Sequence, residues 1–296
     1  MGITDKTVRF LCRHYPFYSG CGKMANSKWL TPFLSKQEQL LSTLRSGEAI
    51  WINPQDHIGR AIDLFGDLDP KITWLFRKIL MPGDICIDIG ANFGLLTILA
   101  ASLVGHSGRV IAVEPQKKLS KMIQASALEN HFDNIAAYPI ALSDRSGTMD
   151  IYIPAHNLGA ASIEHTPKGT YQTETIQVVK VSEFLNDIHT PVKLIKIDVE
   201  NHEDHVIQGA KDYLARTPAE AIIIEVHPSN NIWTDSLSLK ILHELGYEIF
   251  AIPKTVFKVD LVRLDTANPG ALIANDYLAL HTQSPTYHKF LGIIAK

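Results

Sequence analysis

Short apolar runs alternate with helix-like segments along most of this chain, from Asp84 onward. The apolar runs have the character of buried strands and lie at residues 85–89, 109–114, 135–142, 193–199 and 221–226. Segments with helical spacing follow most of them, at residues 94–104, 116–130, 203–215 and 236–245. Strands that alternate with helices of this length predict βαβ units. We therefore expect an α/β fold with a mostly parallel central sheet and helices on both of its faces.

Two β-rich segments interrupt this alternation, at residues 148–153 and 175–181. We interpret them, together with the loop between them, as an antiparallel insertion near the edge of the sheet. The tail has the pattern of a last strand pair, at residues 247–252 and 276–281, which predicts an antiparallel final strand.

The first 80 residues are predicted to form a partly helical N-terminal extension to a domain at residues 81–296. Helical spacing predicts helices at Ser35–Leu44 and Ile72–Leu80. Residues 1–36 carry six lysines and arginines against one aspartate, together with several aromatic residues. This segment is a candidate for weak contact with an anionic partner or a membrane surface. The alternative is a solvated extension that packs its aromatic side chains on the domain.

Composition narrows the classes of protein to which the chain can belong. The formal net charge of −3 argues against a general nucleic-acid binder. The longest apolar stretch is too short to span a bilayer. Three cysteines, Cys12, Cys21 and Cys86, are too few for a disulfide framework, which favours reduced thiols in a cytoplasmic protein.

A glycine-containing loop, Asp88-Ile89-Gly90-Ala91-Asn92-Phe93-Gly94, separates the first predicted strand from its helix. Gly90 and Gly94 allow the backbone to turn tightly and to approach a ligand. Asn92 stands where a dinucleotide-binding loop needs its second glycine, which argues against a nicotinamide-dependent enzyme. Asp88 would repel phosphate and favours a ligand that carries an ammonium group. The alternative is a tight turn without a ligand.

The second predicted strand ends in Glu114 and Pro115. A carboxylate at this position can accept two hydrogen bonds from a ribose diol. Together, Asp88 and Glu114 describe a pocket for a nucleoside with a cationic tail and no phosphate. S-adenosylmethionine fits that description.

Further runs extend this pattern along the chain: residues 82–94, 112–115, 141–144, 195–203 and 224–228. Together they resemble the FkbM-type family of S-adenosylmethionine-dependent methyltransferases, and the D-x-G-A-N-x-G and K-I-D-V-E segments are the most specific. Asn201 stands where the family usually has glycine, and Asn tolerates left-handed backbone better than most residues. The resemblance covers about residues 80–252.

This resemblance implies a Rossmann-like class I methyltransferase fold with S-adenosyl-L-methionine as cofactor. It also implies methylation of a hydroxyl oxygen on a sugar, glycan or secondary metabolite. The alternatives are an N-methyltransferase and a non-catalytic binding module on the same fold. The predicted cofactor-binding residues are Asp88, Gly90, Ala91, Asn92, Gly94, Glu114, Pro115, Ala141 and Leu142.

The predicted catalytic residues are Asp198, Glu200 and His227. Asp198 and Glu200 follow the fourth strand with the spacing of one strand face, and Lys196 precedes them on the same face. Either acid could orient or deprotonate an acceptor. The alternative is that Asp198 caps a turn and Glu200 pairs with Lys196. His227 follows Glu225 at the end of the fifth strand, as a base or as a structural histidine.

Two weaker signals remain. Asp198, His202, Glu225 and His227 could converge on a divalent metal, but their spacing matches no dedicated metal motif, so we predict no metal site. The loop at residues 157–162 suits recognition of the acceptor, and an ordinary mobile surface loop is the alternative.

Overall fold

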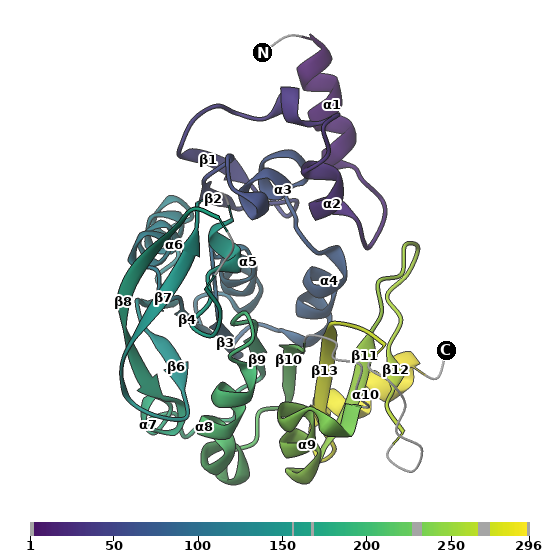
Figure 1. The fold of residues 1–296 in the computed structure, drawn as a ribbon. Helices are drawn as coiled ribbons and strands as arrows, with labels where there is room; N and C mark the ends of the chain where they lie inside the picture. The colour runs from purple at the N-terminus through teal and green to yellow at the C-terminus, as the bar shows by residue number, and fades with distance from the viewer. Residues whose placement is uncertain (1–2, 156, 167–168, 227–232, 266–272, 295–296) are drawn as a thin grey trace.

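The computed structural model of the chain describes residues 3–155, 157–166, 169–226, 233–265 and 273–294. In this part of the chain, a central sheet has eight strands in the order β12-β11-β13-β10-β9-β3-β4-β5 (Figure 1). The five parallel strands are β3 (Ile85–Ile89), β4 (Arg109–Val113), β5 (Ile135–Tyr138), β9 (Leu194–Ile197) and β10 (Ala221–Glu225). These are the predicted apolar runs, and their burial on both faces explains the absence of polar alternation.

The C-terminal strands complete this sheet. They are β11 (Tyr247–Ile252), β12 (Val262–Arg263) and β13 (Asp276–His281). β13 lies between β10 and β11 and runs antiparallel to both, so the predicted antiparallel final strand is confirmed. As a result, β13 starts at the edge of the sheet where the parallel strands end.

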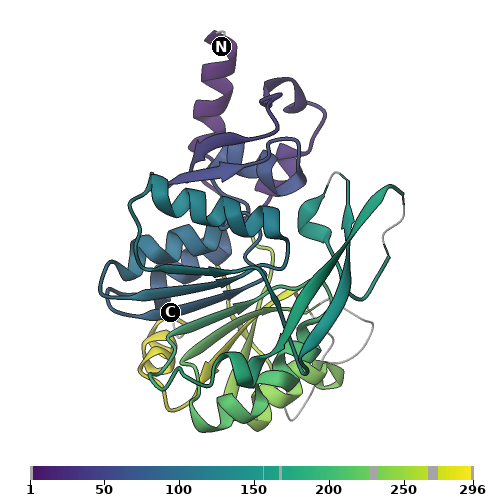
Figure 2. The ribbon, with the colours of Figure 1, turned by 90° about the vertical axis from the view of Figure 1, so that its left-hand side faces the viewer.

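Helices cover both faces of the sheet, as predicted (Figure 2). One apolar core packs α4 (Pro70–Ile79), α5 (Leu95–Val104), α6 (Lys117–Glu129) and α10 (Pro285–Ile294) on the sheet. The other core packs α7 (Val181–Phe184), α8 (Glu203–Arg216) and α9 (Leu237–Glu244) on the opposite face. Thus α4 confirms the helix predicted at residues 72–80.

The insertion forms a sheet of its own. Its strands are β6 (Ala141–Ser143), β7 (Gly147–Pro154) and β8 (Tyr171–Lys180), in the order β6-β8-β7, with β7 and β8 antiparallel. A short 3-10 helix, η2 (Leu158–Ala160), lies in the connection between β7 and β8. The single strand expected at residues 135–142 is wrong, because it breaks after Tyr138 into β5 and β6. Pro139 explains the break, since it has no N–H for the ladder.

The first part of the chain packs above the carboxyl ends of the parallel strands (Figure 1). Its elements are α1 (Ile3–Arg13), α2 (Cys21–Ala25), η1 (Thr31–Phe33), β1 (Leu40–Thr43), β2 (Ala49–Ile52) and α3 (His57–Phe65). The helix expected at Ser35–Leu44 is wrong, because β1 pairs with β2 in a hairpin. The hairpin docks on α6, where Trp51 N donates to Ser126 Oγ at 2.9 Å. This tertiary contact overrides the local helical spacing.

Two of the basic residues near the N-terminus have partners inside the fold. Arg9 Nη1 lies 2.6 Å from the buried Asp63 Oδ1, and Arg13 Nη2 donates to the backbone oxygen of Asp63 at 2.9 Å. Contact between this segment and a membrane surface therefore stays a prediction that rests on the remaining lysines. Among the described residues, the helices are all too short or too polar to cross a membrane. Cys12, Cys21 and Cys86 are buried and unpaired.

Candidate active site

The carboxyl ends of β3, β4, β9 and β10 open onto a cavity of about 710 Å³, a size typical of ligand sites. The strand order reverses between β3 and β9, and ligands of open α/β sheets bind at such a switch point. The cavity is lined by ten of the predicted site residues: Asp88, Gly90, Ala91, Asn92, Glu114, Pro115, Ala141, Leu142, Asp198 and Glu200. The predicted base His227 lies outside the described residues.

The glycine loop turns tightly against its neighbours. Gly90 has φ +79°, and its N–H donates to Val113 O at 2.9 Å. A Cβ on Gly90 would lie 1.8 Å from the backbone oxygen of Asp198. The end of the neighbouring strand β9 is therefore enough by itself to require glycine at this position. Asn92 adopts the left-handed conformation (φ +54°). Gly94 is also left-handed and lies behind the cavity wall, against Ile123.

Glu114 holds the glycine loop through one carboxylate oxygen and the turn after β4 through the other. Oε2 accepts from Asn92 N at 2.9 Å, and Oε1 accepts from Gln116 N at 3.0 Å. Burial raises the pKa of Glu114 to about 7. Each oxygen keeps a lone pair for a second hydrogen bond. The residue can therefore support the loop and accept hydrogen bonds from a ligand in the cavity.

Lys196 lies between two carboxylates at the centre of the site. Its Nζ is 3.5 Å from Asp88 Oδ1 and 3.4 Å from Asp198 Oδ2, and it donates to Gly90 O at 2.8 Å. Asp88 is fully buried, and its Oδ2 accepts from Thr97 Oγ1 at 2.6 Å. The cation that Asp88 contacts in this structure is thus the chain's own ammonium group.

Further acids gather on the side of the cavity that Asp198 lines. Burial and the nearby Asp198 carboxylate raise the pKa of Glu225 well above its ordinary value, and the two side chains share a hydrogen bond. Burial, Asp198 and Glu203 likewise raise the pKa of Glu200 to about 7. This shift favours the protonated form of Glu225 beside Asp198.

The position of Glu200 differs from the expectation of one continuous strand face. β9 ends at Ile197, and Glu200 and Asn201 have left-handed φ values of +55° and +78°. Asn201 thus takes the conformation for which the sequence resemblance leads one to expect glycine. The partner of Lys196 is Asp198 rather than Glu200.

Lys71 also lines the cavity, and the sequence did not indicate it as a site residue. Lys71 is buried, and its Nζ contacts Asp69 and lies 2.7 Å from Asp276 Oδ2. Asp276 is the first residue of β13. Because β13 is antiparallel, its first residue lies at the edge where the parallel strands end, so the predicted antiparallel strand was a signal that could have identified Asp276. Lys71 carries no such signal, because it comes from α4 and meets Asp276 only through the fold.

The loop at residues 157–162 is anchored over the glycine loop. Leu158 N donates to Asp56 Oδ2 at 2.6 Å, and Leu158 O accepts from Gln116 Nε2 at 2.9 Å. Asn157, Gly159 and Ala161 line the cavity. The same loop therefore contacts both the extension and the second βα turn, as a wall of the site would.

The described members of the metal grouping considered from sequence do not come together. Asp198 and Glu225 lie with Lys196, whereas His202 contacts Glu164 and Ser143.

A family model described as the methyltransferase FkbM domain matches residues 88–249. Comparison with curated proteins finds no matching sequence.

Several solved structures resemble the chain at low identity. An FkbM methyltransferase from Methylobacillus flagellatus KT has 15% identity and a TM-score of 0.41, over 76% of this chain and 53% of that one. A SAM-dependent O-methyltransferase from Thermotoga maritima has 13% identity and a TM-score of 0.39, over 83% and 94%. An rRNA methylase from Streptococcus thermophilus has 10% identity and a TM-score of 0.37, over 70% and 91%.

Replacing Gly90 with alanine should destabilise the fold through the Asp198 backbone. Gly83→Ala is the matched control, because Gly83 is also left-handed (φ +91°) but a Cβ there would meet only Ser107 Oγ, at 3.8 Å. The left-handed backbone alone should cost each variant about 1–2 kcal/mol in the free energy of unfolding. Overpacking should cost Gly90→Ala a further ~1–3 kcal/mol in urea denaturation. Equal losses in the two variants would refute the proposed contact.

The raised pKa of Glu225 predicts a pH-dependent stability difference. The ordinary pKa of Glu225 is 4.5, and folding raises it. As pH rises above 4.5, the unfolded chain releases this proton while the folded chain retains it. The free energy of unfolding therefore falls as pH rises. Glu225→Gln keeps a neutral donor and avoids this loss. Its free energy of unfolding relative to the native chain should rise by roughly 1 kcal/mol between pH 5 and pH 8, after allowance for solvent screening. Glu129→Gln, at an exposed site, should show no such trend, and a flat difference for Glu225→Gln would contradict the assignment.

Proposed function

The chain belongs to the FkbM methyltransferase family, and on that premise we propose that it transfers a methyl group from S-adenosylmethionine to a hydroxyl oxygen of a sugar, glycan or secondary metabolite. One observation carries this proposal: a continuous cavity joins the Glu114 loop to the Asp198–Glu225 pair. A methyl donor and an acceptor need such a shared space, because transfer requires the reacting atoms to be close and aligned.

The residues of the cavity suit S-adenosylmethionine. When bound, it supplies a methyl group on a sulfonium centre. We assign Glu114 to accepting hydrogen bonds from the ribose hydroxyls, and the turn at Gly90 and Ala91 to close approach of the cofactor. Asp88 Oδ1 is buried and makes no hydrogen bond among the described residues, and Lys196 Nζ lies 3.5 Å from it. Buried carboxylates suit a cationic cofactor far better than a phosphorylated one.

The Asp198–Glu225 pair is the proposed acceptor-binding end. Asp198 is 42% exposed, so it can reach a bound acceptor, whereas Glu225 is mostly buried beside it. We assign Asp198 to orienting the acceptor hydroxyl and accepting its proton. Protonated Glu225 donates to Asp198 and keeps it in place. Glu200, at the same wall, is assigned to binding the acceptor.

The charge of this wall favours an acceptor without phosphate groups. The two buried lysines of this wall, Lys71 and Lys196, each contact two aspartates, so carboxylates outnumber their ammonium partners even with Glu225 neutral. The same acids support a second candidate, N-methylation, because carboxylates attract an amine or ammonium group. Incubation with labelled S-adenosylmethionine and panels of sugars, amines and RNA, followed by mass spectrometry, separates these cases. Labelled amine or RNA without labelled hydroxyl products would overturn the proposal.

The free thiols favour a cytoplasmic reaction.

Removing the charge of Glu114 should weaken cofactor binding. Glu114→Gln should lower the affinity for S-adenosylhomocysteine by about 1.5–3 kcal/mol, the range for hydrogen bonds to a charged group. Isothermal titration calorimetry measures the loss, with Glu129→Gln as an exposed control. Because Glu114 also holds two backbone N–H groups, the melting temperature without ligand reports any separate effect on the loop. Unchanged affinity in a folded variant would place the ribose elsewhere.

Replacing Asp198 with asparagine should affect turnover more than cofactor binding. If Asp198 accepts the proton of the acceptor, Asp198→Asn should reduce turnover by about 10²-fold or more. The affinity for S-adenosylhomocysteine should change much less, because Asp198 serves the acceptor end. Asparagine also caps turns well, so a purely capping role predicts nearly normal turnover and would refute the catalytic assignment.

A further inference from the structure

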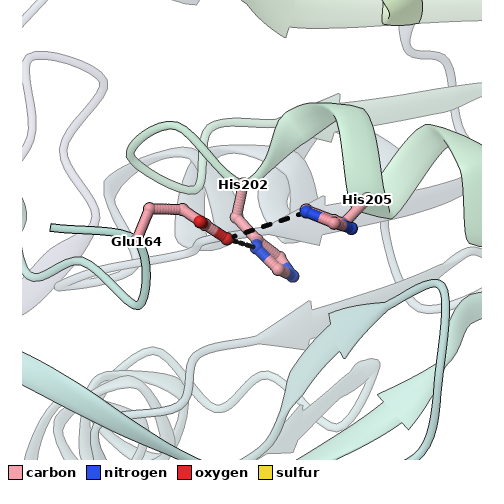
Figure 3. A group of neighbouring side chains, drawn as sticks. All are labelled: Glu164, His202 and His205. Atoms are coloured by element: carbon pink, nitrogen blue, oxygen red, sulfur yellow. Dashed lines mark hydrogen bonds and ion pairs between the residues drawn. The ribbon is translucent and has the colours of Figure 1, made fainter.

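Three side chains with metal-binding atoms meet where the insertion touches the start of α8 (Figure 3). Glu164 comes from the β7–β8 connection. His202 is the residue before α8, and His205 lies in the first turn of that helix. One ligand atom from each lies within 4.8 Å of the other two. Glu164 Oε1 is 2.6 Å from His202 Nδ1 and 3.9 Å from His205 Nε2.

The helix sets the two imidazoles side by side. His202 and His205 are three residues apart, so they lie on the same face of the first turn. Their rings are stacked, with centroids 4.6 Å apart and planes tilted by 23°. Each ring turns one nitrogen toward the Glu164 carboxylate, as Figure 3 shows. A small cation between them would therefore meet ligands from two separate chain segments.

The opposite nitrogens of both rings converge on Asp144. His202 Nε2 lies 2.9 Å from Ser143 Oγ, which donates to Asp144 Oδ1 at 3.0 Å. His205 Nδ1 lies 3.3 Å from Asp144 Oδ2. Metal-binding histidines almost always donate their second ring N–H to a carboxylate, carbonyl or water, which fixes the tautomer and the ring orientation. Both rings thus turn their second nitrogen toward Asp144, His205 directly and His202 through Ser143.

We propose that Glu164, His202 and His205 bind a divalent transition metal, with Zn²⁺ as the best match. Two imidazoles and one carboxylate form a known zinc ligand set, with water in the fourth position. Imidazole suits zinc and its neighbours, whereas magnesium and calcium prefer an all-oxygen set. This inference does not rest on the proposed methyltransferase activity.

The metal fixes the insertion to the turn that carries Glu200. Ser162 Oγ, two residues from Glu164, donates to Glu200 O at 3.0 Å. The preceding loop residues line the cavity, and so does His202. The bound metal thus holds the wall of the candidate active site in position, and its role is positioning rather than catalysis.

Titration of the metal-free full chain with Zn²⁺, and with Co²⁺ as a spectroscopic probe, tests the proposal. The native chain should bind one equivalent with a dissociation constant in the micromolar range or below. Glu164→Gln and His205→Ala, both at partly exposed positions, should each lose more than 100-fold in affinity. Asp144→Asn should lose about 10–100-fold, as expected for a residue that orients ligands.

His106→Ala is the matched control, because His106 also lies beside a carboxylate, with Nδ1 2.9 Å from Asp133 Oδ1, at an exposed site. It should leave the affinity unchanged. Zn²⁺ should also slow proteolytic cleavage within residues 157–166 of the native chain but not of His205→Ala. Absence of saturable binding in the folded native chain overturns the proposal. So does binding that survives both ligand substitutions or falls equally in His106→Ala. None of these readouts requires a cofactor or an acceptor, so they fail or succeed independently of the methyltransferase assay.

Discussion

The buried ammonium group of Lys196 is the interaction on which the cavity depends. Burial alone would lower its pKa, but the carboxylates of Asp198 and Asp88 raise the pKa overall, so the charge persists inside the protein. A buried charge is tolerated only where it has partners. The partners here belong to the ends of β3 and β9, and the Nζ also holds the carbonyl of Gly90. One side chain therefore fixes the distance between the loop assigned to the cofactor and the acid assigned to the acceptor.

Much of the sheet was predictable because its strands are buried on both faces and therefore form short apolar runs. Local pattern was insufficient where tertiary contacts or single residues decide. The segment at Ser35–Leu44 has helical spacing, yet pairing with β2 and docking on α6 make its end a strand. The run at residues 135–142 looks continuous, although Pro139 divides it between two sheets.

The residues of the site were predictable where they directly follow a strand. Gly90, Glu114 and Asp198 all follow strands, and all three meet at the cavity. Lys71 and Glu164 come from a helix and from a loop of the insertion, and no local spacing connects them to the residues they contact. The reason that Gly90 must be glycine was also hidden in the sequence, because the obstacle is the backbone of a distant segment.

The junction at Leu158 has a consequence for how the extension and the insertion depend on each other. Its N–H is held by Asp56, which also caps α3, and its carbonyl is held by Gln116. The extension and the insertion therefore share a hydrogen bond across a hundred residues of chain, while Gln116 ties both to the central sheet. Loss of the Asp56 carboxylate would leave the Leu158 N–H and the first turn of α3 without their partner at the same time. One side chain of the extension therefore supports both its own helix and the loop of the insertion that lines the cavity.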